Sequence, residues 1–270
     1  TSFRIGDESA KICNMLFGKF SNEKLGIVGA NKKQNTIIDT YRRPYDFDKS
    51  VIICRTNANV VGNAIDLAER DRSLFFEGGI SGYKLDFYLA LWYYCCGKEP
   101  LHKDPIFKKF KSYKDLCDYA DEAEDIELLS AIGIVKTYNT KIPDGIRKIK
   151  ECLAKSKNEA DTILTTAHKA KGQTYTWHTF LENDYYKMLD FEEAVSIIES
   201  DMSEELKRSA YKAIVEPLNL LYVAITRAKG YLYLHEDLSK WIIANRIKTE
   251  MRFNRIIREE IQDLKGDINE

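Results

Sequence analysis

Segments with apolar residues at helical spacing alternate along the chain with short apolar runs. This pattern predicts helices that alternate with strands. Residues 7–20 repeat apolar side chains at helical spacing, and Asp7 and Glu8 at their start favour a helix N-terminus. The unbroken apolar run 50–54 is typical of a strand buried in a parallel sheet. Residues 57–70 return to helical spacing behind an Asn that can cap a helix, so a strand-then-helix unit is predicted here.

The same alternation continues toward the end of the chain. Further strands are predicted at 25–28, 73–76, 162–165, 177–181 and 231–234. Further helices are predicted at 85–96, 186–215 and 218–228, the last starting behind Pro217, with a charged helical segment over 240–270. Residues 97–158 have a helical pattern throughout. We therefore predict an α/β fold, a parallel sheet with helices on both faces, interrupted by a small all-helical insertion.

The composition narrows the class of protein. The 270 residues include 41 basic and 42 acidic side chains, and 44 % are hydrophobic, which excludes a disordered or fibrous chain. The longest apolar run, 87–96, is shorter than the roughly 20 residues that a membrane span needs. The six cysteines have no zinc-type spacing and are expected to be buried thiols in a reducing compartment. A balanced total charge is compatible with a local basic patch, so the composition does not exclude a protein that binds nucleic acid.

Two segments carry side chains suited to phosphate chemistry. Residues 165–172 read Thr-Thr-Ala-His-Lys-Ala-Lys-Gly after an apolar strand, and ligands bind at the carboxyl ends of parallel strands. Their hydroxyls, lysines and backbone N–H groups can hold phosphates, although a solvated basic turn has the same residues. Residues 219–229 read Asn-Leu-Leu-Tyr-Val-Ala-Ile-Thr-Arg-Ala-Lys. Arg227 in this segment either satisfies a helix dipole or reaches a transferring γ-phosphate.

In this order, the two segments resemble motifs V and VI of the UvrD-like superfamily 1 helicases. Three further segments of this chain resemble parts of those enzymes. Residues 1–4, Thr-Ser-Phe-Arg, resemble motif IV, and residues 51–59 resemble a strand and the following turn of the second motor domain. Residues 77–84 resemble the Gly-Gly turn that leads into the 2B insertion. The similarity covers roughly residues 1–240. It is closest to the F-box DNA helicase branch, on the strings at 55–60, 138–143 and 167–172, although no F-box is present.

This resemblance implies one half of a motor. Residues 1–96 and 159–239 would form the second RecA-like (2A) domain, 97–158 a 2B-like helical insertion, and 240–270 a helical tail. The implied activity is that of an ATP-dependent 3′–5′ DNA helicase or translocase in DNA repair or recombination. ATP and Mg²⁺ would be held mainly by a first RecA-like domain before Thr1, because the phosphate-loop pattern GxxxxGK[ST] is absent here.

The chain is therefore expected to be a fragment that does not hydrolyse ATP alone. The partners implied by the resemblance are single-stranded DNA, DNA junctions and the first RecA-like domain of the same protein. No membrane association is expected. The protein is expected to be a monomer. The expected compartment is the cytoplasm, or the nucleus of a eukaryotic cell.

The resemblance also assigns roles to individual residues. Arg4 and Arg227 would contact the γ-phosphate as catalytic groups, and a guanidinium suits this role because it stays charged and binds phosphate through a two-pronged fork. Phe3 would stack on the adenine, with a core phenylalanine as the alternative. Thr174 stands where the family has a Glu that meets the nucleotide sugar, and Thr brings no charge. The residues implied to bind nucleic acid are Arg55, Asn57, Thr166, His168 and Lys169.

Several alternatives remain open at this stage. Thr174 favours a non-catalytic nucleic-acid-binding or assembly module that kept the helicase fold, whereas two γ-phosphate arginines favour a motor. An RNA-directed helicase would carry the same motifs. The tyrosines and tryptophans, such as Trp92 and Tyr186, either stack on bases or pack inside the protein. Arg55 is either a strand contact or a structural ion-pair partner, and the lysines of 103–114 form either a duplex contact or a solvated face.

Overall fold

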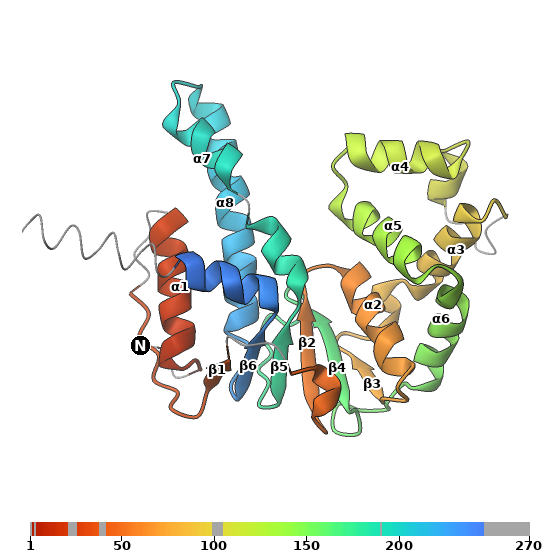
Figure 1. The fold of residues 1–270 in the computed structure, drawn as a ribbon, viewed down its shortest axis with the longest axis horizontal. Helices are drawn as coiled ribbons and strands as arrows, with labels where there is room; N and C mark the ends of the chain where they lie inside the picture. The colour runs from red at the N-terminus through yellow and green to blue at the C-terminus, as the bar shows by residue number, and fades with distance from the viewer. Residues whose placement is uncertain are drawn as a thin grey trace, which may run out of the picture.

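The centre of the molecule is one parallel sheet (Figure 1). The computed structural model describes residues 2, 4–20, 26–37, 42–98, 105–189 and 191–245. Its strands are β1 (Asn35–Ile37), β2 (Ser50–Cys54), β3 (Leu74–Phe76), β4 (Thr162–Thr166), β5 (His178–Leu181) and β6 (Tyr231–Leu234). They lie in the order β1-β6-β5-β2-β4-β3, and every pairing is parallel. The predicted α/β class with a parallel sheet is confirmed, and this arrangement is compatible with a RecA-like domain.

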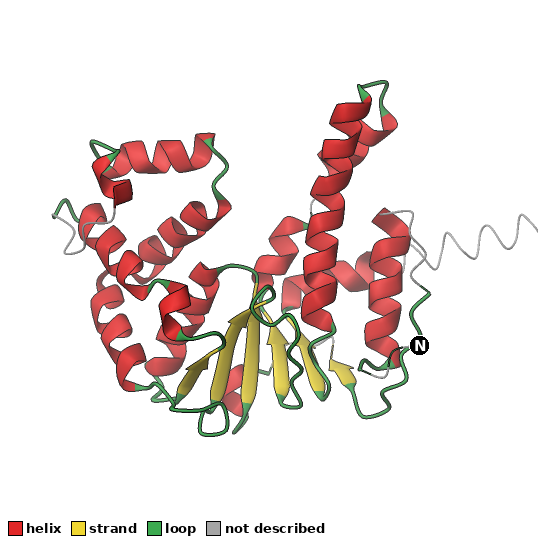
Figure 2. Ribbon diagram, turned by 180° about the vertical axis from the view of Figure 1, so that it is seen from behind, coloured by secondary structure: helices red, strands yellow, loops and turns green. Residues whose placement is uncertain are grey.

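Helices cover both faces of the sheet, and each face has its own apolar core (Figure 2). On one face, α1 (Asp7–Phe20) and α8 (Glu204–Ile225) pack together over side chains such as Ile53. On the other face, α2 (Asn57–Ala68) packs over side chains such as Ile52. Successive residues of a strand point to opposite faces, so these two neighbours in β2 enter different cores.

The described chain between β3 and β4 is helical. It begins with α3 (Leu85–Cys95), which precedes the residues 97–158 predicted as an insertion, and continues within them with α4 (Tyr113–Glu122), α5 (Ile126–Tyr138) and α6 (Ile142–Glu151). These helices gather beside α2 and β3, on the opposite side of the picture from α1 and α8 (Figure 1). Their apolar side chains are continuous with the core under α2, so the insertion and the sheet share one hydrophobic core.

Two glycines allow the insertion to pack closely on α2. A Cβ at Gly62 of α2 would lie 2.8 Å from the Ile134 side chain of α5. A Cβ at Gly145 of α6 would lie 2.9 Å from the Ile65 side chain of α2. Real Cβ atoms do not approach other carbons so closely, so these positions keep α5 and α6 in tight contact with α2.

The helices before β6 correct one prediction. Pro217 was expected to separate a helix over 186–215 from a helix over 218–228, but it lies inside the single helix α8. The break occurs instead at 200–203, between α7 (Glu192–Glu199) and α8, where the Ser203 hydroxyl caps α8 by accepting from the Leu206 N–H. Proline costs one intrahelical hydrogen bond. The buried face of α8 continues on both sides of it, at Ile214 and Leu218, and keeps the helix whole.

Smaller corrections concern the first sixty residues and the thiols. Residues 26–28 form no strand, since only Gly29 makes a bridge, to Ser2, and residue 25 lies outside the described residues. Strand β1 was not predicted, because its three residues lack an apolar run. Cys95 and Cys96 are exposed, against the expectation of buried thiols. Among the described residues no helix is long and apolar enough to cross a membrane.

Candidate nucleotide and nucleic-acid sites

The predicted site residues lie in two groups at opposite edges of the sheet. The arginine group consists of Arg4, Thr174 and Arg227; the last two precede β5 and β6 and so lie at the amino ends of the strands. The strand-end group follows the carboxyl ends of β2 and β4 and consists of Arg55, Asn57, Thr166, His168 and Lys169. Phe3 lies outside the described residues. The sheet therefore separates the groups expected to meet nucleotide from those expected to meet nucleic acid.

Arg227 is held in place by neutral acceptors. Its side chain is buried, with 8 % of the residue exposed. The guanidinium donates to the carbonyl oxygens of Val223 (Nε, 2.9 Å) and Gln173 (Nη1, 3.1 Å) and to the hydroxyl of Thr226 (Nη2, 2.9 Å). None of these partners carries a negative charge, so the positive charge of Arg227 is fixed but not neutralised.

A second positive charge lies beside it. Burial lowers the pKa of Arg227, and the charge of Arg4 lowers it further. Arg4 itself is exposed. An anion such as phosphate would relieve the repulsion between these two charges, because each guanidinium can bind phosphate through paired N–H groups.

Amide side chains bring the Arg4 segment to the Arg227 segment. Asn31 Nδ2 donates to the carbonyl oxygens of Arg4 (2.9 Å) and Lys229 (3.1 Å). Gln34 Nε2 donates to the carbonyl oxygen of Ala228 (2.9 Å). These bonds join residues almost two hundred positions apart in the sequence, and they explain why the two predicted arginines come together.

Thr174 lies on the same edge, between two residues that bond to Arg227. The carbonyl of Gln173 accepts from the guanidinium, and the Tyr175 N–H donates to the Arg227 carbonyl oxygen (2.8 Å). Thr174 is exposed between them. A ligand on the arginine group would therefore meet an uncharged hydroxyl here, which can form a hydrogen bond but no ion pair.

Lys169 is the centre of the strand-end group. Its Nζ donates to the carbonyl oxygen of Gly82 (2.8 Å) and to Oδ1 of Asn57 (3.4 Å), and it lies 3.3 Å from the centre of the Tyr83 ring. The Thr166 hydroxyl accepts from the Lys169 N–H (3.4 Å). Burial lowers the pKa of Lys169. The ammonium is thus bonded to neutral oxygens and lies over a ring, while the charge of Glu127 opposes the effect of burial on its pKa. An incoming phosphate would be attracted to this cation.

Arg55 and His168 stand at the margin of this group. His168 is exposed directly before Lys169. Arg55 is half-buried and faces α5, since its charge opposes the burial that raises the pKa of Glu127.

Asp184 organises the turn after β2 and was missed by the sequence analysis. Its Oδ2 accepts from the N–H groups of Arg55 (2.7 Å) and Thr56 (3.0 Å) and from Asn59 Nδ2 (2.8 Å). Only 6 % of the residue is exposed, and burial raises the pKa of its carboxyl to about 6 despite these bonds. Its position in the sequence could have identified it as a candidate. It follows the end of predicted strand 177–181 by three residues, and polar side chains are common at the carboxyl ends of the strands in parallel sheets.

The fold and these two groups define an α/β protein with separate cationic sites at the two edges of a parallel sheet. One edge offers paired guanidiniums, and the other offers an ammonium among amide and hydroxyl groups. No protein-family model matches the sequence. The function is therefore argued from the two groups themselves.

Proposed function

We propose that this chain is the second RecA-like domain of an ATP-dependent DNA helicase or translocase that moves 3′ to 5′ on single-stranded DNA, in repair or recombination. The observation that carries the proposal is the pair of guanidiniums. Arg227 is buried and fixed by neutral acceptors, and Arg4 is near enough to lower its pKa. Such a pair has a clear use in phosphoryl transfer, where arginine stabilises charge that spreads over the transferred group.

ATP fits the arginine group as one half of its site. When bound, it supplies a γ-phosphoryl group whose transfer to water releases the free energy for movement. Arg4 and Arg227 would orient this group and stabilise its charge, and Thr174 would offer one hydrogen bond beside them. The β-phosphate and Mg²⁺ would be held by a first RecA-like domain, because the sequence of this chain contains no phosphate loop.

The strand-end group supports the nucleic-acid half of the proposal. Asn57, Thr166 and Lys169 meet at the carboxyl ends of β2 and β4, where ligands of parallel sheets bind. Ammonium, amide and hydroxyl groups are the usual partners of backbone phosphates.

The chain alone is expected to show no ATP turnover, with or without single-stranded DNA. Half of the groups that phosphoryl transfer needs are missing from its sequence. A phosphate-release assay on the purified 270-residue chain checks this. DNA-stimulated ATP hydrolysis by that chain would contradict the division of the active site between two domains.

Lys169→Ala should weaken binding of oligo-dT to the chain by about fivefold at low salt. One lost phosphate contact should also make the slope of log affinity against log salt shallower by about 0.7. Fluorescence anisotropy at several stated salt concentrations measures both.

The matched control is Lys150→Ala on α6, which removes an exposed lysine paired with Asp86 (3.0 Å). It should change neither the affinity nor the slope. Equal effects of the two variants would show that the strand-end group is not the binding site. Tighter binding of oligo-U than of oligo-dT would favour an RNA-directed motor.

Thr174 supports a second candidate, a non-catalytic nucleic-acid-binding or assembly module. An uncharged, exposed residue at this position can form only a weaker hydrogen bond to the nucleotide sugar than a carboxylate can. The two candidates differ in the complete protein, since a motor hydrolyses ATP in the presence of single-stranded DNA and a module does not.

A further inference from the structure

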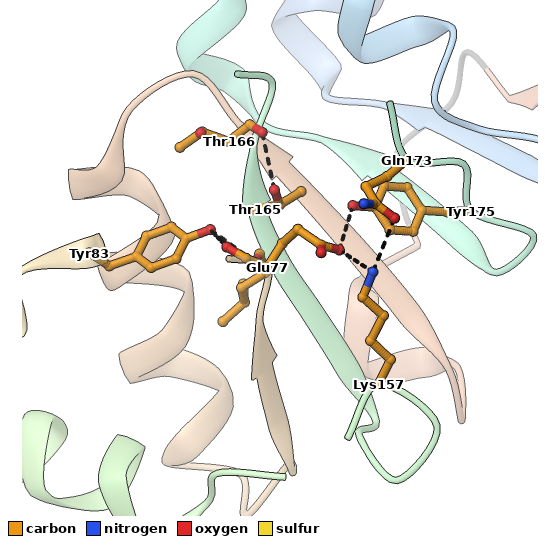
Figure 3. Close-up of polar contacts among 8 residues, drawn as sticks. Glu77, Tyr83, Lys157, Thr165, Thr166, Gln173 and Tyr175 are labelled. Atoms are coloured by element: carbon orange, nitrogen blue, oxygen red, sulfur yellow. Dashed lines mark hydrogen bonds and ion pairs between the residues drawn. The ribbon is translucent and has the colours of Figure 1, made fainter. Parts of the chain in front are cut away.

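A set of contacts runs from Lys169 at one edge of the sheet to Arg227 at the other, and Glu77 lies at its centre. Figure 3 shows the polar contacts around Glu77. We infer that Glu77 and Tyr175 are positioning residues that transmit nucleic-acid binding at the strand-end group to Arg227. This inference rests on the proposed function, and it adds residues to which the resemblance assigns no role.

The first step runs from Lys169 to Glu77. The Lys169 ammonium lies over the ring of Tyr83, which is completely buried. The Tyr83 hydroxyl donates to the carbonyl oxygens of Glu77 (2.9 Å) and Leu164 (3.4 Å). A phosphate that draws the ammonium toward itself would change the force on Tyr83, and through its hydroxyl on the backbone at Glu77.

The second step runs from Glu77 to the segment before β5. The Glu77 carboxylate is buried, with 8 % of the residue exposed. Its Oε2 accepts from the Tyr175 hydroxyl (3.1 Å) and lies 2.6 Å from Lys157 Nζ, which also donates to Oε1 of Gln173 (3.2 Å). Figure 3 shows these side chains converging from β3, from the loop before β4 and from the crossover to β5. The carboxylate therefore holds Tyr175 directly and Gln173 through Lys157, at the two ends of the segment 173–175.

Thr165 of β4 strengthens this second step. Hydrogen bonding to its hydroxyl opposes the burial that raises the pKa of Tyr83 and of Tyr175. The same hydroxyl donates to the Thr166 carbonyl oxygen (3.1 Å), as drawn in Figure 3. Both phenols are thus influenced by one strand residue.

The third step runs from the segment 173–175 to Arg227. The Gln173 carbonyl accepts from the guanidinium (3.1 Å), the Tyr175 N–H donates to the Arg227 carbonyl oxygen (2.8 Å), and the Lys229 N–H donates to the Tyr175 carbonyl oxygen (2.7 Å). Backbone and side chain of Arg227 are both bonded to this segment. Its position therefore depends on where Glu77 holds Tyr175.

Hydrogen exchange of the 270-residue chain tests this link. The amides of Tyr175 and Lys229 lie in its last step, so their exchange should slow by about fivefold when oligo-dT binds. Tyr175→Phe keeps the ring and removes the hydroxyl. It should bind oligo-dT with an affinity within about twofold of wild type, yet lose the slowing at both amides. Glu77→Gln, which keeps an acceptor for the phenol, should retain part of the slowing.

Tyr138→Phe is the matched control. It removes another phenol hydroxyl that donates to a carboxylate, Asp66 Oδ2 at 2.9 Å, and it lies outside the link. It should retain the full slowing, and near-ultraviolet circular dichroism checks that all variants fold. Unchanged amides in wild type bound to oligo-dT, or full slowing in Tyr175→Phe, would overturn the link alone. Failure of wild type to bind oligo-dT would overturn the proposed function and the link with it.

Discussion

Replacing Arg227 by alanine should lower ATP turnover by the complete protein by at least about 10³-fold, the usual contribution of an arginine that stabilises transferred phosphate. The structure gives this arginine a fixed position, because three neutral acceptors hold its guanidinium. The loss should fall mainly on kcat, since charge develops on the transferred group only as the reaction proceeds. Steady-state kinetics with saturating single-stranded DNA measure it.

Arg227→Lys separates charge from geometry. Lysine keeps the positive charge and loses the planar fork, so it should recover only a small part of the rate. Arg147→Ala, which removes an exposed arginine of α6 bonded to Glu151, should leave turnover unchanged. Because Arg227 also bonds to the backbone, thermal unfolding of each variant must accompany the kinetics. Turnover near the wild-type rate in a folded Arg227→Ala protein would remove this residue from the active site.

Raising the pH from about 3 to about 8 should reduce the contribution of Asp184 to the free energy of unfolding by about 3 kcal/mol. Burial raises the pKa of this carboxyl from 3.8 to about 6, so the folded protein binds the proton more tightly than the unfolded chain. Its stabilising effect is complete below about pH 4 and is lost as the pH rises through about 6. Glu182 adds to the rise, and the N–H groups of Arg55 and Thr56 oppose it.

Asp184→Asn isolates this effect, because the amide does not titrate. Urea unfolding of both proteins across this pH range should give curves that diverge by about 3 kcal/mol. Burial also raises the pKa of Asp66 and Glu127, but these residues are present in both proteins and cancel in the difference. Parallel curves would mean that Asp184 has an ordinary pKa in the folded protein.

Much of the fold could be predicted because its strong elements are local in sequence. The run 50–54 is apolar throughout, and it forms a strand buried on both faces. The continuation of α8 as a single helix through Pro217 could not be predicted in this way. A proline costs a helix a hydrogen bond wherever it occurs, and only tertiary packing on both sides of it decides whether the helix continues.

The candidate site was predictable only in part, for a similar reason. Arg4 and Arg227 could be named from their motifs, but their approach depends on Asn31, whose amide bridges distant segments. Asp184 and Glu77 act through single side chains at strand ends, and neither has a periodic pattern around it.

The close packing of the insertion on α2 has a mechanical consequence. Gly62 and Gly145 bring α5 and α6 against α2, and the Tyr138 hydroxyl bonds to the Gly62 carbonyl oxygen (3.0 Å). The insertion therefore packs directly on α2 through two of its helices. A load on its helices passes directly into α2, whose first residue, Asn57, touches Lys169. Strain applied far from the sheet would therefore reach the strand-end group, the proposed nucleic-acid site.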